Sequence, residues 1–305
     1  MREQDKVVAI LCSDIHLSHT PPVARSDEPD WYEAMARPLK ELHRLTKAHP
    51  NAVVVCAGDI FDKWNSPPQL INWAIKNLPK MYAVPGQHDL PHHNYNDIRK
   101  SAYWTLVEAG VVEDLPPDHC RIILPDLALY GFPWECPIKP LKGTKEKKEM
   151  IHLAVVHAYC WFGSKKYPNA KRSSYVRAHI KRLRGFDAAV FGDNHKGFLT
   201  TKKDFSLLNC GGFMRRRIDE KEYKPMVGLL RRDGTIDCHF LETENDVLSI
   251  PKDPKSNHND FSDFIGSLNE MYDLGLDFEQ AVSHYLLGHE LNPETVKAIR
   301  KVIDM

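Results

Sequence analysis

Five short segments each place one or more carboxylate, amide or imidazole side chains directly after an apolar run. The segments are "AILCSDIHLS", "VVVCAGDIFDK", "MYAVPGQHD", "LAVVHAY" and "AAVFGDNHKG". Mixed oxygen and imidazole donors are typical ligands of divalent cations such as Mn²⁺, Fe²⁺, Mg²⁺ and Zn²⁺. One such segment alone is more often a turn or a cap. Five in order along one chain predict a metal site.

The apolar runs that precede these side chains have the pattern of buried β-strands. Strands are predicted at "KVVAILCS", "NAVVVCAG", "KMYAVPG", "DLALYGF", "IHLAVVHA", "FDAAVFG" and "FSLLNCGG". Helical periodicity is found between them, at residues 31–48, 67–78, 96–109 and 173–184. This alternation predicts a layered α/β fold, in which strand ends place reactive groups at the carboxyl edge of a sheet.

The sequence pattern changes in the last part of the chain. "KPMVGLLRRDGTIDCHFLE" predicts a hairpin around Asp233 and Gly234. After Ile250 a polar linker leads into three helical patterns that begin near Asp260, Asp277 and Asn292. We therefore expect one domain over 1–250, followed by a linker and a small helical module over 251–305. The mixed-charge segment 142–149 is predicted to be an exposed loop.

Composition limits the cellular context. The chain has 305 residues, of which 42% are hydrophobic, enough for one large core. Its first apolar run is too short for an export signal or a membrane span, so no membrane contact is expected. The seven cysteines form no CxxC pair, and several lie in apolar runs. They are typical of reduced, buried thiols, which predicts a cytoplasmic protein.

Charge is balanced overall but unevenly distributed. Lys plus Arg and Asp plus Glu both number 41, so the total charge does not favour nucleic acid. Residues 165–184, however, contain eight basic residues and no acidic one. Residues 242–305 contain thirteen acidic and five basic residues, a net charge of about −8. A neutral total thus conceals a basic middle and an acidic tail.

The five segments together resemble the calcineurin-like metallophosphoesterase superfamily, whose signature is DxH, GDxxD, GNH(D/E), a His, and GHxH. The matching blocks are "DIH" at 14–16, "GDIFD" at 58–62, "GQHD" at 86–89, His157, and "GDNH" at 192–195. The resemblance covers residues 8 to about 215 and implies a four-layer α/β/β/α sandwich with the helical module as an appendage. Two positions depart from the signature, with Gln87 in place of Asn and Asp193 in place of His.

The resemblance implies a site for two divalent cations. One would be held by Asp14, His16 and His195, the second by Gln87, His157 and Asp193, and Asp59 would bridge both. An anionic oxygen at Asp193 favours a hard ion, so Mn²⁺ is expected, with Mg²⁺, Fe²⁺ or Zn²⁺ as alternatives. Both departures fall on the second cation, which leaves open a retuned site or a scaffold without activity.

The resemblance also implies roles around the phosphate. His88 would donate a hydrogen bond or a proton to the leaving oxygen, and Asp89 would orient the His88 imidazole. Asp62 would hold the geometry of the ligands. For Asp89 and Asp62 the alternative is simple turn capping.

The finer resemblance is to SbcD-type nucleases of DNA double-strand break repair. It is carried by "GDIFDKW" and by the segment that starts "NCGGFMRRRIDEKEYKPMVGLL". It implies a DNA exonuclease or endonuclease of repair or recombination. Tyr167 or Tyr175 could then stack on a base, and phosphates would be bound by Lys165, Lys166, Lys171, Arg172 and Arg177. The alternatives are a solvated basic face without a ligand, and a phosphoesterase of a nucleotide or lipid-sugar diphosphate.

Partners are implied by the same resemblance. SbcD-type nucleases act with an SMC-like ATPase of the SbcC type, and the acidic helical tail at 260–303 could dock on such a subunit. Alternatively, its apolar stripe packs on neighbouring helices of the same chain. A homodimer through helices near 67–109 is a further expectation.

Overall fold

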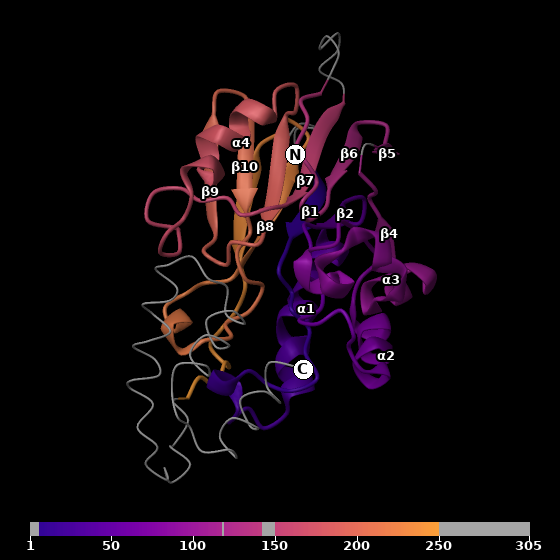
Figure 1. Ribbon diagram of the computed structural model, residues 1–305, viewed down its shortest axis with the longest axis vertical. Helices are drawn as coiled ribbons and strands as arrows, with labels where there is room; N and C mark the ends of the chain where they lie inside the picture. The colour runs from indigo at the N-terminus through magenta and orange to yellow at the C-terminus, as the bar shows by residue number, and fades with distance from the viewer. Residues whose placement is uncertain (1–5, 118, 142–149, 250–305) are drawn as a thin grey trace, which may run out of the picture. The chain divides into compact units, whose positions relative to one another are not determined.

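The structure is a computed structural model that describes residues 6–117, 119–141 and 150–249 (Figure 1). Contacts between Cα atoms divide the chain into two units, Met1–Pro251 and Lys252–Met305. The predicted linker and helical module at 251–305 lie outside the described residues, as does the predicted loop at 142–149.

Two six-stranded sheets form the centre of the first unit. The strand order of one sheet is β12 (Ile236–Phe240), β11 (Met226–Arg231), β1 (Val7–Cys12), β2 (Val53–Cys56), β3 (Met81–Ala83) and β4 (Val112–Asp114). The order of the other is β5 (Cys120–Leu124), β6 (Leu127–Phe132), β7 (Ile151–His157), β8 (Ala188–Gly192), β10 (Phe205–Asn209) and β9 (Phe198–Lys202). In each sheet four strands run parallel, β1 to β4 in one and β6, β7, β8 and β10 in the other.

The parallel strands are apolar on both faces because both faces are covered. Between the sheets, Leu11 and Val55 pack with Val155, Val190 and Leu208, all fully buried. On the opposite face of the first sheet, residues such as Ile10 belong to a second core that it shares with helices. Successive strand residues thus alternate between the two cores.

Helices complete the outer layers. α1 (Trp31–Ala48), α2 (Pro68–Asn77) and α3 (Ala102–Glu108) supply apolar residues to the outer core of the first sheet. α4 (Val176–Arg182) packs on the second sheet around Phe191. Figure 1 shows α1 to α3 and α4 on opposite sides of the sheets. The predicted α/β/β/α sandwich is confirmed.

Some boundaries differ from the predictions. Residues 96–109 are not one helix, because Ser101 has an extended backbone and its hydroxyl caps α3 by accepting a hydrogen bond from the Trp104 amide at 3.2 Å. A 3₁₀ helix, Tyr95–Lys100, precedes that cap. The sequence also fails to predict β4, β5 and β9, which pair on one side only and carry several exposed or polar residues. Such edge strands lack the continuous apolar run of buried strands.

The structure also bears on the predictions about the cysteines and about membrane spans. No disulfide joins any of the seven cysteines, all of which lie in the described part of the chain. Among the described residues no helix combines the length and the apolar character needed to cross a bilayer.

His179 on α4 predicts an acid-sensitive step in stability. Burial lowers the pKa of His179 to about 4, from 6.5 in the unfolded chain, although its ring bonds the Tyr159 carbonyl at 3.1 Å. Between these pH values the unfolded state binds a proton that the folded state does not, so stability falls as the pH falls from 6.5 to 4. In urea unfolding at pH 7 and pH 4.5, we expect the wild type to lose about 2–3 kcal/mol more than His179→Gln. Equal losses in both proteins would contradict this assignment.

Candidate metal centre

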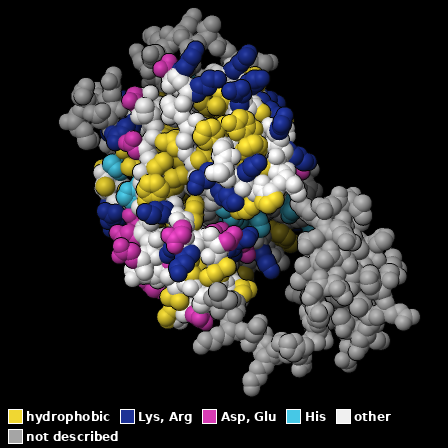
Figure 2. All heavy atoms as spheres, turned by 90° about the vertical axis from the view of Figure 1, so that its left-hand side faces the viewer, with side chains coloured by type: hydrophobic (Ala, Val, Ile, Leu, Met, Phe, Trp, Pro, Cys, Tyr) yellow, Lys and Arg dark blue, Asp and Glu magenta, His cyan; other side chains and the backbone are white. Residues whose placement is uncertain are grey.

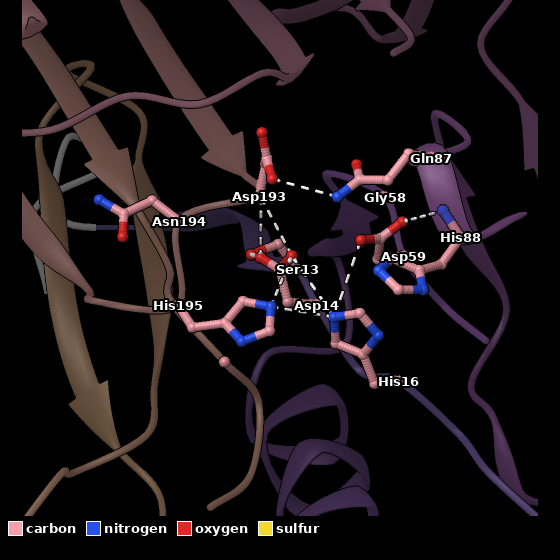
Figure 3. Close-up of polar contacts among 12 residues, drawn as sticks. Ser13, Asp14, His16, Gly58, Asp59, Gln87, His88, Asp193, Asn194 and His195 are labelled. Carbon is pink, nitrogen blue, oxygen red and sulfur yellow. Dashed lines mark hydrogen bonds and ion pairs between the residues drawn. The ribbon is translucent and has the colours of Figure 1, made fainter. Parts of the chain in front are cut away.

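The predicted ligands meet where five parallel strands end (Figure 3). Asp14 and His16 follow β1, Asp59 follows β2, and Gln87 follows β3. From the second sheet, His157 is the last residue of β7, and Asp193 and His195 follow β8. Carboxyl ends of parallel strands share one edge of a sheet. The carboxyl edges of the two stacked sheets lie next to each other, so both sheets contribute residues to one site.

Glycines allow the loops to approach this closely. Gly58, just before Asp59, has a φ of +94°, and a Cβ there would lie 2.3 Å from the His157 ring. A Cβ on Gly86, just before Gln87, would lie 2.1 Å from a carboxylate oxygen of Asp59. No other residue type fits at either place.

Four ligand positions have left-handed backbones. Their φ angles are 51° at Asp14, 49° at His16, 55° at Asp59 and 85° at Asp193. Each such residue costs about 1–2 kcal/mol, so the neighbouring structure must hold it in place. Main-chain hydrogen bonds do so, from the Asp14 amide to the Gly58 carbonyl at 2.9 Å and from the His16 amide to the Asp59 carbonyl at 3.0 Å.

The first group of donors is Asp14, His16 and His195. The Nε2 atoms of the two histidines lie 3.0 Å apart. An Asp14 carboxylate oxygen lies 3.9 Å from His16 Nε2 and 3.7 Å from His195 Nε2. Donor atoms about 2.1 Å from one ion are about 3.0–3.4 Å apart, so a small inward movement would let these three atoms hold one cation.

The second group is Asp59, His157, Gln87 and Asp193. His157 Nε2 lies 3.4 Å from Asp59 Oδ2 and 2.6 Å from Gln87 Oε1. The Gln87 amide also donates a hydrogen bond to Asp193 at 3.1 Å. The two residues that depart from the family signature therefore contact each other.

Asp59 lies between the groups, and one of its buried oxygens makes no hydrogen bond among the described residues, although the His157 imidazole lies 3.4 Å away. Its Oδ1 accepts a hydrogen bond from the His88 amide at 3.0 Å. Its Oδ2 is buried without a hydrogen-bond partner among the described residues, 3.7 Å from His16 Nε2. An orphaned carboxylate oxygen is costly unless a cation satisfies it. The donor set therefore fits two divalent cations, with Asp59 between them.

The pKa values of the ligands at the site are shifted by burial and by the charges of their neighbours. Burial, together with the neighbouring Asp59, raises the pKa of Asp14 to about 8. Burial also opposes ionisation of Asp59, but His157 outweighs it and holds the pKa of Asp59 below its usual range. Burial would lower the pKa of His157, yet Asp59 raises it to about 10. The two buried carboxylates thus share one imidazolium, and further positive charge is needed to ionise both.

His88 and Asp62 lie beside the first group. The His88 side chain is exposed, with its ring edge-on to that of His16 at 4.9 Å between centroids. His88 Nδ1 donates to the Asp62 backbone carbonyl at 2.8 Å, which leaves Nε2 free to face a ligand. The Asp62 carboxylate lies 3.6 Å from His16 Nδ1. This position suits the predicted role of Asp62 in holding a ligand.

Asp89 does not contact the His88 imidazole, contrary to the prediction. Its fully buried carboxylate accepts main-chain hydrogen bonds from Ile60 at 3.2 Å, Phe61 at 3.1 Å and Gly86 at 3.0 Å. Burial raises the pKa of Asp89 to about 7. Asp89 therefore ties the Asp59 loop to the Gln87 loop, which is the capping alternative.

The sequence analysis assigned no role to Arg216 or to Asn194, the amide between two predicted ligands in "GDNH". The Arg216 guanidinium donates to the His16 carbonyl at 2.9 Å and pairs with Asp62 at 2.8 Å. The buried Asn194 lies between two predicted ligands and donates to the carbonyls of Cys160 at 2.7 Å and Lys165 at 2.9 Å. The signals were the arginine run after Gly212 and the third position of "GDNH", respectively.

The predicted DNA-binding side chains are all exposed. They are Lys165, Lys166, Lys171, Arg172 and Arg177. The two tyrosines offered for base stacking are engaged elsewhere. Tyr175 packs on Trp161 with ring centroids 4.6 Å apart, and the Lys196 ammonium lies 4.7 Å over the Tyr167 ring.

A comparison with known protein families agrees with this fold. A family model described as calcineurin-like phosphoesterase matches residues 8–197. No curated protein matches the sequence significantly. Similar solved structures include YfkN from Bacillus subtilis (13% identity, TM-score 0.46, covering 80% of this chain and 93% of that one). Others are the Thermus thermophilus sulfate thiohydrolase SoxB (13%, 0.43, 79% and 58%) and an archaeal phosphodiesterase (12%, 0.39, 76% and 99%). These likenesses are too weak to carry an argument about function.

Asp59→Asn tests the shared ligand. The amide keeps the shape and one acceptor oxygen but removes the charge, so Mn²⁺ affinity should fall about 100-fold or more. We expect Mn²⁺ to raise the thermal midpoint of the EDTA-treated wild type clearly, and that of the variant much less. Asp97→Asn, at a surface carboxylate paired with Lys100, is the matched control. An undiminished Mn²⁺ effect in Asp59→Asn would contradict the assignment.

Asp89→Asn tests the tie between the loops. An amide nitrogen in place of one oxygen leaves at least one of the three amide donors unpaired, which should cost about 1–3 kcal/mol of unfolding free energy. Urea unfolding in EDTA at pH 8 measures this cost without any contribution from metal. Asp204→Asn changes an exposed carboxylate by the same atoms and should cost almost nothing. Equal stabilities of the two variants would overturn the proposed tie.

Proposed function

Because this chain belongs to the calcineurin-like phosphoesterase family, we propose that it hydrolyses phosphodiester bonds with two divalent cations. More narrowly, we propose an SbcD-type DNA exonuclease or endonuclease of repair or recombination. The convergence of Asp14, His16 and His195 with Asp59 and His157 supports the hydrolase. The substrate is inferred from the surface beside these ligands.

The chemistry divides between the bound cations and the chain. A bound pair of divalent cations supplies positive charge for the phosphate oxygens and a water acidic enough to attack near neutral pH. His88 is the exposed acid of the site. Because its Nδ1 is held by the Asp62 carbonyl, a proton on Nε2 can pass to the leaving oxygen. Arg216, which bonds the His16 carbonyl and pairs with Asp62, would help to position His16 and His88.

One observation supports DNA as the substrate. The basic loop is attached to the metal centre through Asn194, whose amide binds the Lys165 carbonyl at 2.9 Å. Lys196, next to His195, donates to the Lys166 carbonyl at 2.9 Å. These bonds support a proposal that the lysines of this loop lie near the reacting phosphate, where they would bind the neighbouring phosphates of a polymer. A nucleotide or lipid-sugar diphosphate offers no such row of phosphates.

A second candidate is a scaffold without activity. The hydrogen bond between Gln87 and Asp193 satisfies two of the proposed ligands with each other. If this bond persists in the presence of metal, only the first cation would bind. The chain would then keep the fold and lose the chemistry that needs two ions.

We also propose a native metal ion, a cellular location and two partners for this chain. Mn²⁺ is the proposed native ion, and the cytoplasm is the proposed location. An SMC-like ATPase of the SbcC type and a second copy of this chain are the proposed partners. Neither the location nor the partners are needed for the hydrolytic test that follows, which uses Mn²⁺.

His88→Ala should abolish most hydrolysis while leaving metal binding intact. General acid catalysis typically contributes 10²–10⁴-fold, so the turnover of labelled linear and single-stranded DNA should fall by about that factor. His119→Ala, which removes an exposed imidazole that bonds the Pro117 carbonyl, is the matched control. Turnover of DNA and of bis-p-nitrophenyl phosphate is measured with Mn²⁺.

The outcomes separate the candidates. DNA cleavage by the wild type and by His119→Ala, lost in His88→Ala, supports the nuclease. Turnover of only bis-p-nitrophenyl phosphate or of a nucleotide panel would replace DNA with a small-molecule substrate. No turnover of any substrate, with one metal ion bound, would support the scaffold.

A further inference from the structure

Phe162 is an exposed aromatic side chain in the loop attached to the metal centre. It is 40% exposed, which is unusual for a phenylalanine. A tight turn presents it, because the Lys165 amide donates to the Phe162 carbonyl at 3.0 Å and the two residues form an isolated bridge. The ring and the Lys165 side chain therefore stand side by side on the surface.

The turn is fixed at both ends beside the candidate ligands. Asn194 donates to the Cys160 carbonyl at 2.7 Å and to the Lys165 carbonyl at 2.9 Å. Phe162 is two residues from Cys160, so their Cα atoms are at most about 8 Å apart. Asn194 itself lies between Asp193 and His195. The turn that carries Phe162 is thus tied to the loop that holds two of the candidate ligands.

The ring rests on a rigid base. Phe162 stacks with Tyr175 at an interplanar angle of 23° and contacts Phe198, with ring centroids 6.4 and 6.0 Å away. Trp161 is less available, since Tyr175 lies 4.6 Å from one side of it and the Lys166 ammonium lies 5.0 Å over its ring. Phe162 is therefore the aromatic ring in this cluster that can accept a partner.

Three basic residues of the segment around Phe162 form no ion pair with a carboxylate among the described residues. Within the described part of the chain, no ion pair is formed by Lys165, Lys171 or Arg172, and all three are exposed. Figure 2 shows Lys and Arg side chains spread over the upper part of this face, interleaved with hydrophobic ones. A partner for this surface should therefore carry both flat apolar groups and negative charge.

We propose that Phe162 is a stacking platform for an unpaired base of single-stranded DNA, with Lys165, Lys171 and Arg172 binding the adjacent phosphates. The inference rests on the proposed function and narrows its substrate to an unpaired strand at the metal centre. Bases in a single strand expose their faces, and stacking on an aromatic ring needs no sequence-specific hydrogen bond. In a duplex both faces of each base are covered by neighbours, so Phe162 would have nothing to stack on.

The test measures binding without catalysis. A fluorescein-labelled short oligothymidine is titrated with the full chain in EDTA, and anisotropy reports the affinity. Phe162→Ala should weaken binding about 5- to 100-fold, the range for losing one stacked base. Phe162→Trp, which keeps an aromatic ring, should bind about as tightly as the wild type. Phe162→Leu, which keeps apolar bulk without a ring, should bind weakly. Phe240→Ala, at a 56% exposed phenylalanine on β12, is the matched control and should not change binding.

Results with the wild type or with the Phe162→Leu variant could overturn the proposal. One is a wild type that fails to bind oligothymidine, or that binds a blunt duplex equally well. The other is a Phe162→Leu variant that binds like Phe162→Trp, because apolar bulk alone would then explain the contact. The binding assay contains EDTA and is therefore independent of catalysis. A wild type that binds oligothymidine in this assay, but hydrolyses none of the substrates tested with Mn²⁺, would refute the proposed hydrolase and leave the stacking role of Phe162 intact.

Discussion

Two fully buried carboxylates, Asp14 and Asp59, at the junction of two sheets are the constraint on which the rest of the structure depends. A buried charge without a partner is strongly destabilising, and one Asp59 oxygen has no hydrogen bond among the described residues. The imidazolium of His157 offsets only part of this charge. The site is therefore built to receive cations, and its donor atoms already lie at nearly the spacing that ions require.

The surrounding structure serves this constraint. Left-handed backbones at Asp14 and Asp59 turn the chain sharply enough to bring both carboxylates inward. Asp89 holds the loops together through three main-chain amides instead of through His88. Arg216 pairs with Asp62, whose carbonyl fixes His88. Apart from the Arg216–Asp62 ion pair, these contacts join a side chain to a backbone group, and most of them link two different loops. The loops therefore position the ligands as a connected unit.

Because many contacts that hold the site together involve backbone groups, only part of the site could be predicted from the sequence. The motifs around Asp14, Asp59 and His157 identify the site, because ligand chemistry requires particular residue types at strand ends. Side-chain to main-chain contacts leave no such requirement in the sequence, so the partner of Asp89 and the role of Arg216 were missed. The layered fold follows from the apolar periodicity of the parallel strands. Its edge strands and the break at Ser101 do not, since they depend on local exposure and capping.

The central claim is that one chain holds two cations bridged by Asp59, despite Gln87 and Asp193. The most direct measurement is a titration of EDTA-treated protein with Mn²⁺, followed by calorimetry and by electron paramagnetic resonance. Two adjacent Mn²⁺ ions are coupled through their shared ligand. We therefore predict two bound ions per chain and loss of the isolated six-line Mn²⁺ signal as the second ion binds. One ion per chain, with an isolated signal at saturation, would contradict the account.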